Sequence, residues 1–222
     1  PPISNLESFK PSVVTKIYDK DGNIISELFI ERRVLVPLKD TPADLQNAFI
    51  AIEDNNFYEH WGISTKGILR AFVINFLKGK VSQGGSTITQ QLAKTIFLTS
   101  ERTITRKIKE MLLTVQLEHE YTKEEILQLY INQIYFGAGG YGAESACKIY
   151  FGKSVKDINL AEAALIAGLP KAPNYYSPLK NPEIAKNRRA VVLSRMRDLG
   201  FITKEQEEEA NNQPLPDKRP LP

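Results

Sequence analysis

The stretch Thr41-Pro-Ala-Asp-Leu-Gln-Asn-Ala-Phe-Ile-Ala-Ile-Glu53-Asp-Asn-Asn-Phe-Tyr-Glu-His-Trp-Gly62 sets the interpretation of the whole chain. Its first half predicts a helix, with Thr41 as the N-cap and Pro42 as the first helical residue. The apolar residues of this half fall on one helical face: Leu45, Ala48, Phe49 and Ile52. Two carboxylates, Glu53 and Asp54, follow at the helix end.

The second half of this stretch is an aromatic loop that ends at Gly62. A carboxylate beside apolar walls can hold its proton more tightly and so act as a general base near neutral pH. Glu53 is therefore a candidate catalytic base. The alternative, a solvated helix end, stays open at this point because surface carboxylates greatly outnumber catalytic ones.

Outside this stretch the pattern is mostly helical. Residues 13–36 alternate around Asp21-Gly22 and predict a short hairpin, the only clear β signal. About eight to ten helices are expected after it. Capping signatures open three of them: Thr122 with Glu125, Asn159 with Glu162, and Thr203 with Gln206. Three glycines look like helix stops: Gly137, Gly168 and Gly200.

Composition is that of an ordinary folded protein, with 25% charged and 42% hydrophobic residues and a net charge of +3. Cys147 has no second cysteine to pair with, and no apolar run reaches the roughly eighteen residues that span a bilayer. We expect an N-terminal extension with the hairpin at 1–40, the main domain at 41–211, and a Pro-rich linker at 212–222.

One segment is apolar almost all round. It runs from Lys66 to Lys80, with its apolar part from Ile68 to Leu77 and cations towards both ends: Lys66, Arg70, Lys78 and Lys80. Such a segment suits a membrane interface, where apolar side chains enter the acyl boundary and cations meet anionic headgroups. A buried core helix is the alternative.

The basic stretch of the chain is the candidate anion site. Glycines before Ser86 lead into a helix that carries Gln91 and Lys94, and a helix start presents backbone N–H groups to an anion. Further cations follow: Arg102, Arg106, Lys107 and Lys109. On the helix expected from Thr103, a carboxylate, Glu110, is held among these cations, although an exposed Arg106–Glu110 pair would give the same spacing. The opposite face of that helix is apolar, with Ile104, Ile108, Met111 and Val115.

Five blocks of the sequence, in order, resemble the glycosyltransferase domain of class A penicillin-binding proteins and the monofunctional peptidoglycan glycosyltransferases. They are Glu53-Asp-x-x-Phe-x-x-His60-x-Gly62, Gly84-Gly-Ser-Thr-Ile-Thr-Gln-Gln-Leu-Ala-Lys94, Arg106-Lys-x-x-Glu110, Ile126-Leu-x-x-Tyr-x-Asn132-x-x-Tyr-Phe-Gly137 and Leu160-Ala-Glu-Ala-Ala-Leu-Ile-Ala-Gly168. The order of all five is far more specific than any single block.

The resemblance implies a mainly α, lysozyme-like fold with a globular head and a smaller membrane-facing jaw at about 63–100. The apolar segment from Ile68 to Leu77 would lie in that jaw. The resemblance also implies the extracytoplasmic (periplasmic) face of the cell inner membrane, and a transpeptidase domain beyond the Pro-rich linker. The expected partners are lipid II, the growing glycan chain and moenomycin-type inhibitors, and no nucleic acid.

The resemblance assigns a role to each candidate residue. Glu53 would deprotonate the acceptor sugar, and Glu110 would be the second essential carboxylate. The expected substrate-binding residues are Ser86, Gln91, Lys94, Arg102, Arg106 and Lys107. The expected supports of the Glu53 loop are Asp54, His60 and Asn132. No metal site is predicted from the histidines, and no cofactor is required, although Glu110 acting through a divalent cation (Mg²⁺ or Mn²⁺) is an open alternative.

Two rival functions remain. A muramidase or lytic transglycosylase would cleave the same polymer with a carboxylic acid, but the cations argue against it because glycan cleavage releases no pyrophosphate. A membrane-bound adaptor would use only the basic helix, and its function would be indifferent to substitution of Glu53 and Glu110.

Overall fold

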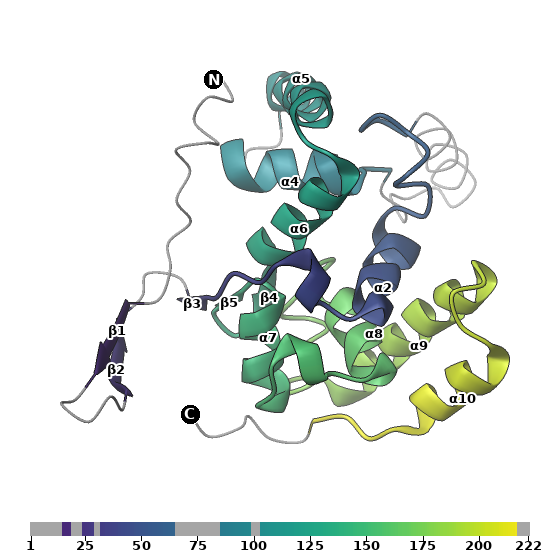
Figure 1. Cartoon of the computed structure of the whole chain (residues 1–222). Coiled ribbons are helices and arrows are strands. Elements are labelled where there is room, and N and C mark those ends of the chain that lie inside the picture. Colours follow the sequence, from purple (N-terminus) through teal and green to yellow (C-terminus); the bar gives the residue numbers. More distant parts are fainter. Residues whose placement is uncertain (1–14, 19–23, 29–31, 65–84, 99–102, 217–222) are drawn as a thin grey trace.

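Helices make up most of the described part of the chain (Figure 1). The structure, a computed structural model, describes residues 15–18, 24–28, 32–64, 85–98 and 103–216. Within these ranges lie eight α-helices: α2 (Ala43–Glu53), α4 (Ile88–Phe97), α5 (Ile104–Glu120), α6 (Lys123–Gln133), α7 (Ala143–Phe151), α8 (Leu160–Gly168), α9 (Pro182–Asp198) and α10 (Lys204–Asn212). The expected mainly α fold is confirmed.

The predicted hairpin is present. Strands β1 (Thr15–Tyr18) and β2 (Ile24–Leu28) pair antiparallel, with Thr15 opposite Leu28. A second small sheet was not predicted: β3 (Arg32–Arg33) pairs parallel with β5 (Gly140–Tyr141), which pairs antiparallel with β4 (Tyr135–Gly137). Strands this short give no readable alternation, which is why the sequence did not reveal them.

Gly137 is not a helix stop, as the sequence suggested. Helix α6 already ends at Gln133, and Gly137 lies in β4 with φ +90°. This left-handed backbone favours glycine and lets the chain turn from β4 into β5. Gly168 does end α8, and Gly200, with φ +74°, follows the C-cap of α9.

The predicted capping boxes all form. In each, the N-cap side chain accepts from the backbone N–H three residues on, and the side chain at that position accepts from the N-cap N–H. A fourth box, Thr87 with Gln90, opens α4 and was missed. Its two residues have the same spacing of three as those of the predicted boxes.

The start of α2 differs from the prediction by one residue. Pro42, not Thr41, is the N-cap. The Thr41 hydroxyl instead donates to Leu38 O at 2.6 Å, at the end of the 3₁₀ turn Leu38–Asp40. The predicted start of α5 at Thr103 is confirmed, since Thr103 accepts from Arg106 N.

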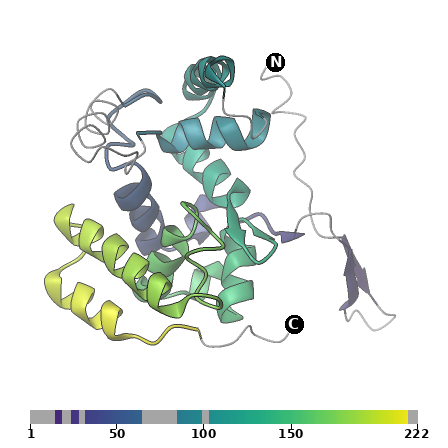
Figure 2. The same cartoon turned by 180° about the vertical axis from the view of Figure 1, so that it is seen from behind.

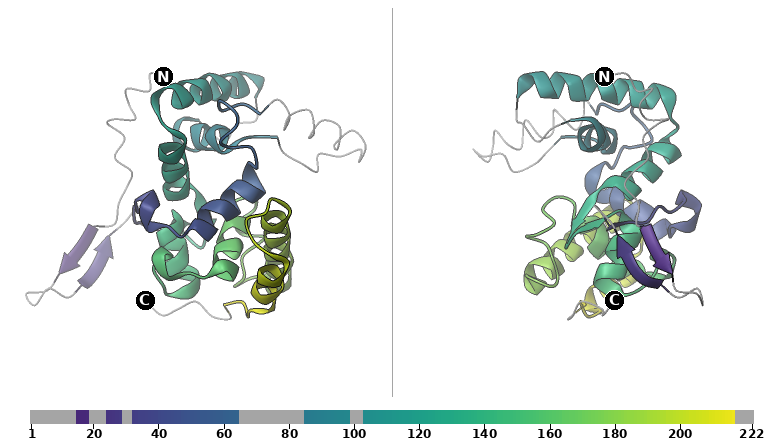
Figure 3. Two further views of the ribbon diagram at one scale, coloured as in Figure 1. Left: turned by 45° about the vertical axis from the view of Figure 1, so that its right-hand side comes forward. Right: turned by 90° about the vertical axis from the view of Figure 1, so that its left-hand side faces the viewer.

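The helices form two groups with α2 between them (Figures 2 and 3). Helices α4 and α5 and the beginning of α6 lie at one end, and α7 to α10 at the other. Helix α2 packs on α8 and α9, and its Phe49 meets Tyr130 of α6 and Phe136 at ring centroid distances of 5.7 and 6.0 Å. Because α2 is fixed on both sides, its last residue, Glu53, has a defined position.

Part of the expected N-terminal extension packs against the helical body. Val36 belongs to the core, and β3 pairs with β5. At the other end, the buried guanidinium of Arg189 donates to Asn211 O and Gln213 O at 2.9 and 2.7 Å, which fixes the end of α10 on α9. Most of the expected jaw, including Ile68 to Leu77, lies outside the described residues. Within the described ranges no helix has the length and hydropathy needed to cross a membrane.

Candidate functional site

Glu53 ends α2 and is held by α4. Its carboxylate accepts from the side-chain amide of Gln91, with Nε2 2.8 Å from Oε2. The other end of that amide accepts from the Tyr130 hydroxyl at 3.3 Å. Residues from α2, α4 and α6 therefore form one chain of hydrogen bonds that orients the Glu53 carboxylate.

The surroundings of Glu53 favour its protonated form. Burial is the main cause that raises the pKa of this carboxyl, and the charge of Asp54 adds to it. The hydrogen bond from Gln91 and the positive charges of Arg188 and Lys171 act in the opposite direction. A carboxylate with a raised pKa is a stronger base than an exposed one, as general base catalysis requires.

Three of these neighbours were not predicted. Tyr130 is fully buried, and burial together with the charges of Glu53 and Asp54 holds the pKa of its phenol well above the ordinary value. Arg188 of α9 donates from Nε to Gly168 O at 3.1 Å. Lys171 follows the last of the five sequence blocks. Neither cation has a spacing in the sequence that links it to Glu53, because the fold of α8 and α9 brings them there.

Asp54 and His60 close the loop that follows Glu53. Asp54, 7% exposed, accepts from Ile88 N at 3.0 Å and from His60 Nε2 at 2.9 Å. The N–H of Gly62 donates to His60 Nδ1 at 3.1 Å, so the neutral imidazole carries its proton on Nε2 and donates to Asp54. Asp54 also lies at the N-terminus of α4, where a carboxylate is favoured by the helix dipole. The loop is thereby tied to α4.

Asn132 holds a different segment from the one we expected. Its side chain accepts from Val36 N at 2.9 Å and donates to Val36 O at 2.8 Å and to Gln128 O at 2.9 Å. It therefore joins α6 to the segment after β3, and none of these contacts reaches the Glu53 loop.

Glu110 is the centre of a second cluster. Its side chain is 3% exposed, and Arg106 Nη1 lies 2.7 Å from Oε2 while Lys107 Nζ donates to Oε1. Lys107 also contacts Ser86 Oγ at 3.3 Å. The alternative of a fully exposed surface pair is thus wrong for Glu110. A carboxylate buried in this way fixes the two cations rather than adding much stability.

Helix α4 connects the two clusters. Ser86, just before its N-cap, meets Lys107, while Gln91 on the helix meets Glu53. Lys94 is exposed one turn after Gln91, on the same helical face. Arg102 lies outside the described residues. The structure thus brings the predicted residues into two groups that α4 connects, with Glu53 in one and the cations around Glu110 in the other.

The residues around Glu110 do not fit a divalent-cation site. Both of its oxygens already accept from Arg106 and Lys107. In the part of the chain that the structure describes, no three His, Cys, Asp or Glu side chains gather to hold a metal ion. The charge needed at this site can come from the cations themselves.

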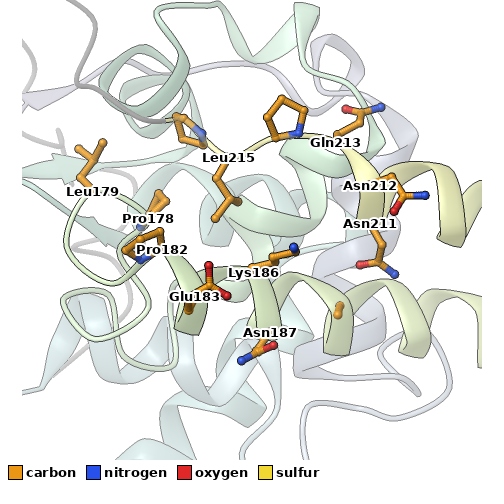
Figure 4. Close-up of a pocket in the computed structure, with 13 residues that line it drawn as sticks. Pro178, Leu179, Pro182, Glu183, Lys186, Asn187, Asn211, Asn212, Gln213 and Leu215 are labelled. Atoms are coloured by element: carbon orange, nitrogen blue, oxygen red, sulfur yellow. The ribbon is translucent and has the colours of Figure 1, made fainter.

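A hollow of about 730 Å³ lies elsewhere on the molecule, between α9 and the residues that follow α10 (Figure 4). Pro178, Glu183, Lys186, Asn212 and Leu215 are among its lining residues, and no predicted site residue is. This hollow is therefore separate from the base and the cation cluster.

A carboxyl of raised pKa near a set of cations is the arrangement that a transferase acting on a substrate with an anionic leaving group would require. Comparison with known proteins agrees. The profile of the transglycosylase family matches residues 21–197. The chain belongs to this family. At the level of the family, the match confirms the expected class of enzyme, a peptidoglycan glycosyltransferase.

Similar proteins include penicillin-binding protein 1A of Aquifex aeolicus, 50% identical over 96% of this chain and 30% of that protein. Penicillin-binding protein 1A of Neisseria gonorrhoeae is 46% identical over 97% of this chain and 27% of the relative. The crystal structure of penicillin-binding protein 1A from Haemophilus influenzae has a TM-score of 0.56 at 29% identity, covering 96% of this chain and 22% of that one. The chain therefore spans less than a third of the length of these relatives.

Proposed function

We propose that this domain polymerises lipid II, a disaccharide-pentapeptide on undecaprenyl pyrophosphate. It joins the growing glycan to the next disaccharide with inversion and releases undecaprenyl pyrophosphate. The observation that carries the proposal is the pairing of a raised-pKa carboxyl, Glu53, with the cation cluster around Glu110 through the single helix α4. A sugar transfer from pyrophosphate needs a base at the acceptor and positive charge at the leaving group.

Glu53 acts as the general base. It takes the proton of the acceptor sugar's 4-hydroxyl while that oxygen attacks the anomeric carbon of the donor and the bond to pyrophosphate breaks. The hydrogen bond from Gln91 orients the carboxylate for this step. The charges of Arg188 and Lys171 lower its pKa and so favour the ionised form that accepts a proton.

The cations stabilise the departing pyrophosphate. Lys107 and Arg106 are held by Glu110, and Lys94 extends from α4 into solvent. Because Arg106 and Lys107 are held by Glu110 before the reaction, they need little reorganisation as negative charge develops. Ser86 supplies a hydroxyl beside Lys107, and Arg102 is a further contact expected from the sequence. Moenomycin-type inhibitors would compete at this site. A hydrolase would have no use for the cluster, which favours the transferase.

The domain works at a membrane surface, in our proposal the extracytoplasmic face of the inner membrane. One face of α5 supports this placement because its large apolar side chains are exposed: Ile104 82%, Ile108 54%, Met111 38%, Leu112 62% and Val115 39%. A soluble surface rarely gathers so many on one helix. Together with the segment from Ile68 to Leu77, this face would bring the site to its lipid-linked substrate.

The test is incubation of the domain with labelled lipid II in detergent, with products separated by size. We expect a ladder of long glycans from the wild type and from Glu59→Gln, an exposed carboxylate in the same loop. We expect no ladder from Glu53→Gln, because its rate of polymerisation should fall about 10²–10⁴-fold. Polymer from Glu53→Gln would refute the assignment of the base. Cleavage of preformed glycan would indicate a hydrolase, and binding without turnover an adaptor.

A further inference from the structure

A second, partly buried ion pair lies where α4, α5 and α6 meet, apart from the contacts described above. Glu118 of α5 and Lys123 of α6 have side chains 8% and 18% exposed, and Lys123 Nζ lies 2.7 Å from Glu118 Oε2. The other carboxylate oxygen accepts from Lys123 Nζ at 2.9 Å and from the Thr89 hydroxyl of α4 at 2.5 Å. One carboxylate thus joins all three helices.

The same pair also touches the loop that leaves Glu53. Lys123 Nζ lies 4.7 Å from the centroid of the Phe57 ring, which is fully buried. At the far end of the loop, Gly62 packs so closely on Glu118 that a Cβ there would lie 2.7 Å from Glu118 Cγ. Both the middle and the end of the loop are therefore set against this pair.

We propose that Glu118 and Lys123 are positioning residues for the transfer reaction, fixing the 54–62 loop and α4 relative to each other so that Gln91 meets Glu53. The inference rests on the function proposed above. Thr89 lies two positions before Gln91 on α4, so the hydrogen bond from its hydroxyl to Glu118 sets where that helix lies. The contact of Gly62 with Glu118 sets the loop against the same carboxylate.

Stability alone does not account for this pair. Two charges removed from water usually contribute little net stability compared with well-packed apolar residues, and their value lies in the one geometry they permit. Here that geometry links three helices and a loop: α4 carries Gln91, and the loop begins directly after Glu53. Loosening the pair would let the loop move away from α4 and admit water to Glu53.

Admission of water would be visible in the behaviour of Glu53. Burial is the main cause of its raised pKa, so hydration would lower that pKa towards the ordinary value. The charged and titratable groups that face Glu53 would be unchanged in sequence: Asp54, Tyr130, Lys171 and Arg188. The acid limb of the pH–rate profile would therefore move to lower pH while kcat fell.

The experiment compares Glu118→Gln, Thr89→Val and Thr89→Ser in the lipid II assay over a range of pH. Glu118→Gln removes the charge but keeps the shape of the side chain. Thr89→Val removes the hydroxyl, whereas Thr89→Ser keeps it. We expect the first two to lower kcat about 10- to 100-fold with little change in KM and to shift the acid limb to lower pH. Thr89→Ser should keep the kcat and the acid limb of the wild type. The exposed pair on α10, changed by Lys204→Met or Glu208→Gln, is the matched control and should leave both unchanged.

Several outcomes would overturn the inference. Variants that lose thermal stability but keep the wild-type kcat and acid limb would show that the pair is only structural. If Glu118→Gln fails to fold, Thr89→Val and Thr89→Ser decide the question. If the wild type makes no glycan, the proposed function fails, and NMR titration of the Glu53 carboxyl, assigned with Glu53→Gln, replaces the assay. An unchanged Glu53 pKa in Thr89→Val would then refute the positioning role.

Discussion

Gln91 donates to Glu53 across 2.8 Å, and this contact joins the second of the five sequence blocks to the first. The amide stabilises the ionised carboxylate without neutralising it, because it carries no charge. It therefore opposes the effect of burial, which raises the pKa of Glu53. The balance between the two decides how much of the base is ionised at a given pH.

Replacing Gln91 by Leu should raise the pKa of Glu53 further, because the hydrogen bond that favours the ionised form is lost. The acid limb of the kcat profile then moves to higher pH. Below that limb, kcat falls about tenfold for each unit of the shift. The measurement is turnover of lipid II against pH, with Gln116→Leu, an exposed position on α5, as control. A limb that stays in place would contradict the role of Gln91.

Glu53→Gln should stabilise the fold at alkaline pH. A carboxyl whose folded-state pKa lies above the ordinary 4.5 contributes stability at low pH that is lost as pH rises through the folded value. Gln has no charge to bury, so the variant avoids this loss. We expect its Tm to exceed that of the wild type by about 2–4 °C at pH 8 and the difference to vanish near pH 4. Thermal scans at both pH values test this, and an advantage confined to acid pH would contradict it.

The sequence predicted those parts of the fold that local patterns encode. The capping boxes at Thr122, Asn159 and Thr203 formed because each depends on residues three positions apart. The sheet of β3, β5 and β4 was missed because its pairing of Arg32 with Gly140 is long-range and its strands are too short to show alternation. The position of Asn132 against Val36 has the same long-range origin.

The residues of the candidate site also fall into those that local spacing predicts and those that only the tertiary fold brings together. The cluster of Arg106, Lys107 and Glu110 could be predicted because one helical turn brings the three together. The cations that moderate Glu53, Arg188 and Lys171, could not, because they reach it only through the packing of α2 on α8 and α9. No spacing in the sequence carries that information.

Lys107→Met should weaken use of the lipid-linked donor much more than Lys109→Met. Lys107 is held by Glu110 beside Ser86, whereas Lys109 is an exposed neighbour on the same helix. Loss of a charge-assisted hydrogen bond to pyrophosphate costs about 1.5–3 kcal/mol, a change of roughly 10- to 150-fold in kcat/KM. Steady-state kinetics of both variants provide the measurement. Equal losses in the two would indicate a general effect of positive charge and not a site at Lys107.

The exposed apolar face of α5 should bind membranes. Ile108 and Leu112 are 54% and 62% exposed one turn apart, and changing both to Asn keeps the helix while removing about half of that face. Because apolar burial contributes roughly 25 cal/mol per Å², the loss should reduce partition to anionic vesicles about tenfold or more. Val191→Asn, at a 49% exposed apolar position on α9, is the matched control. Vesicle co-sedimentation at two salt concentrations measures the effect, and equal partition of both variants and the wild type would assign membrane contact to another part of the chain.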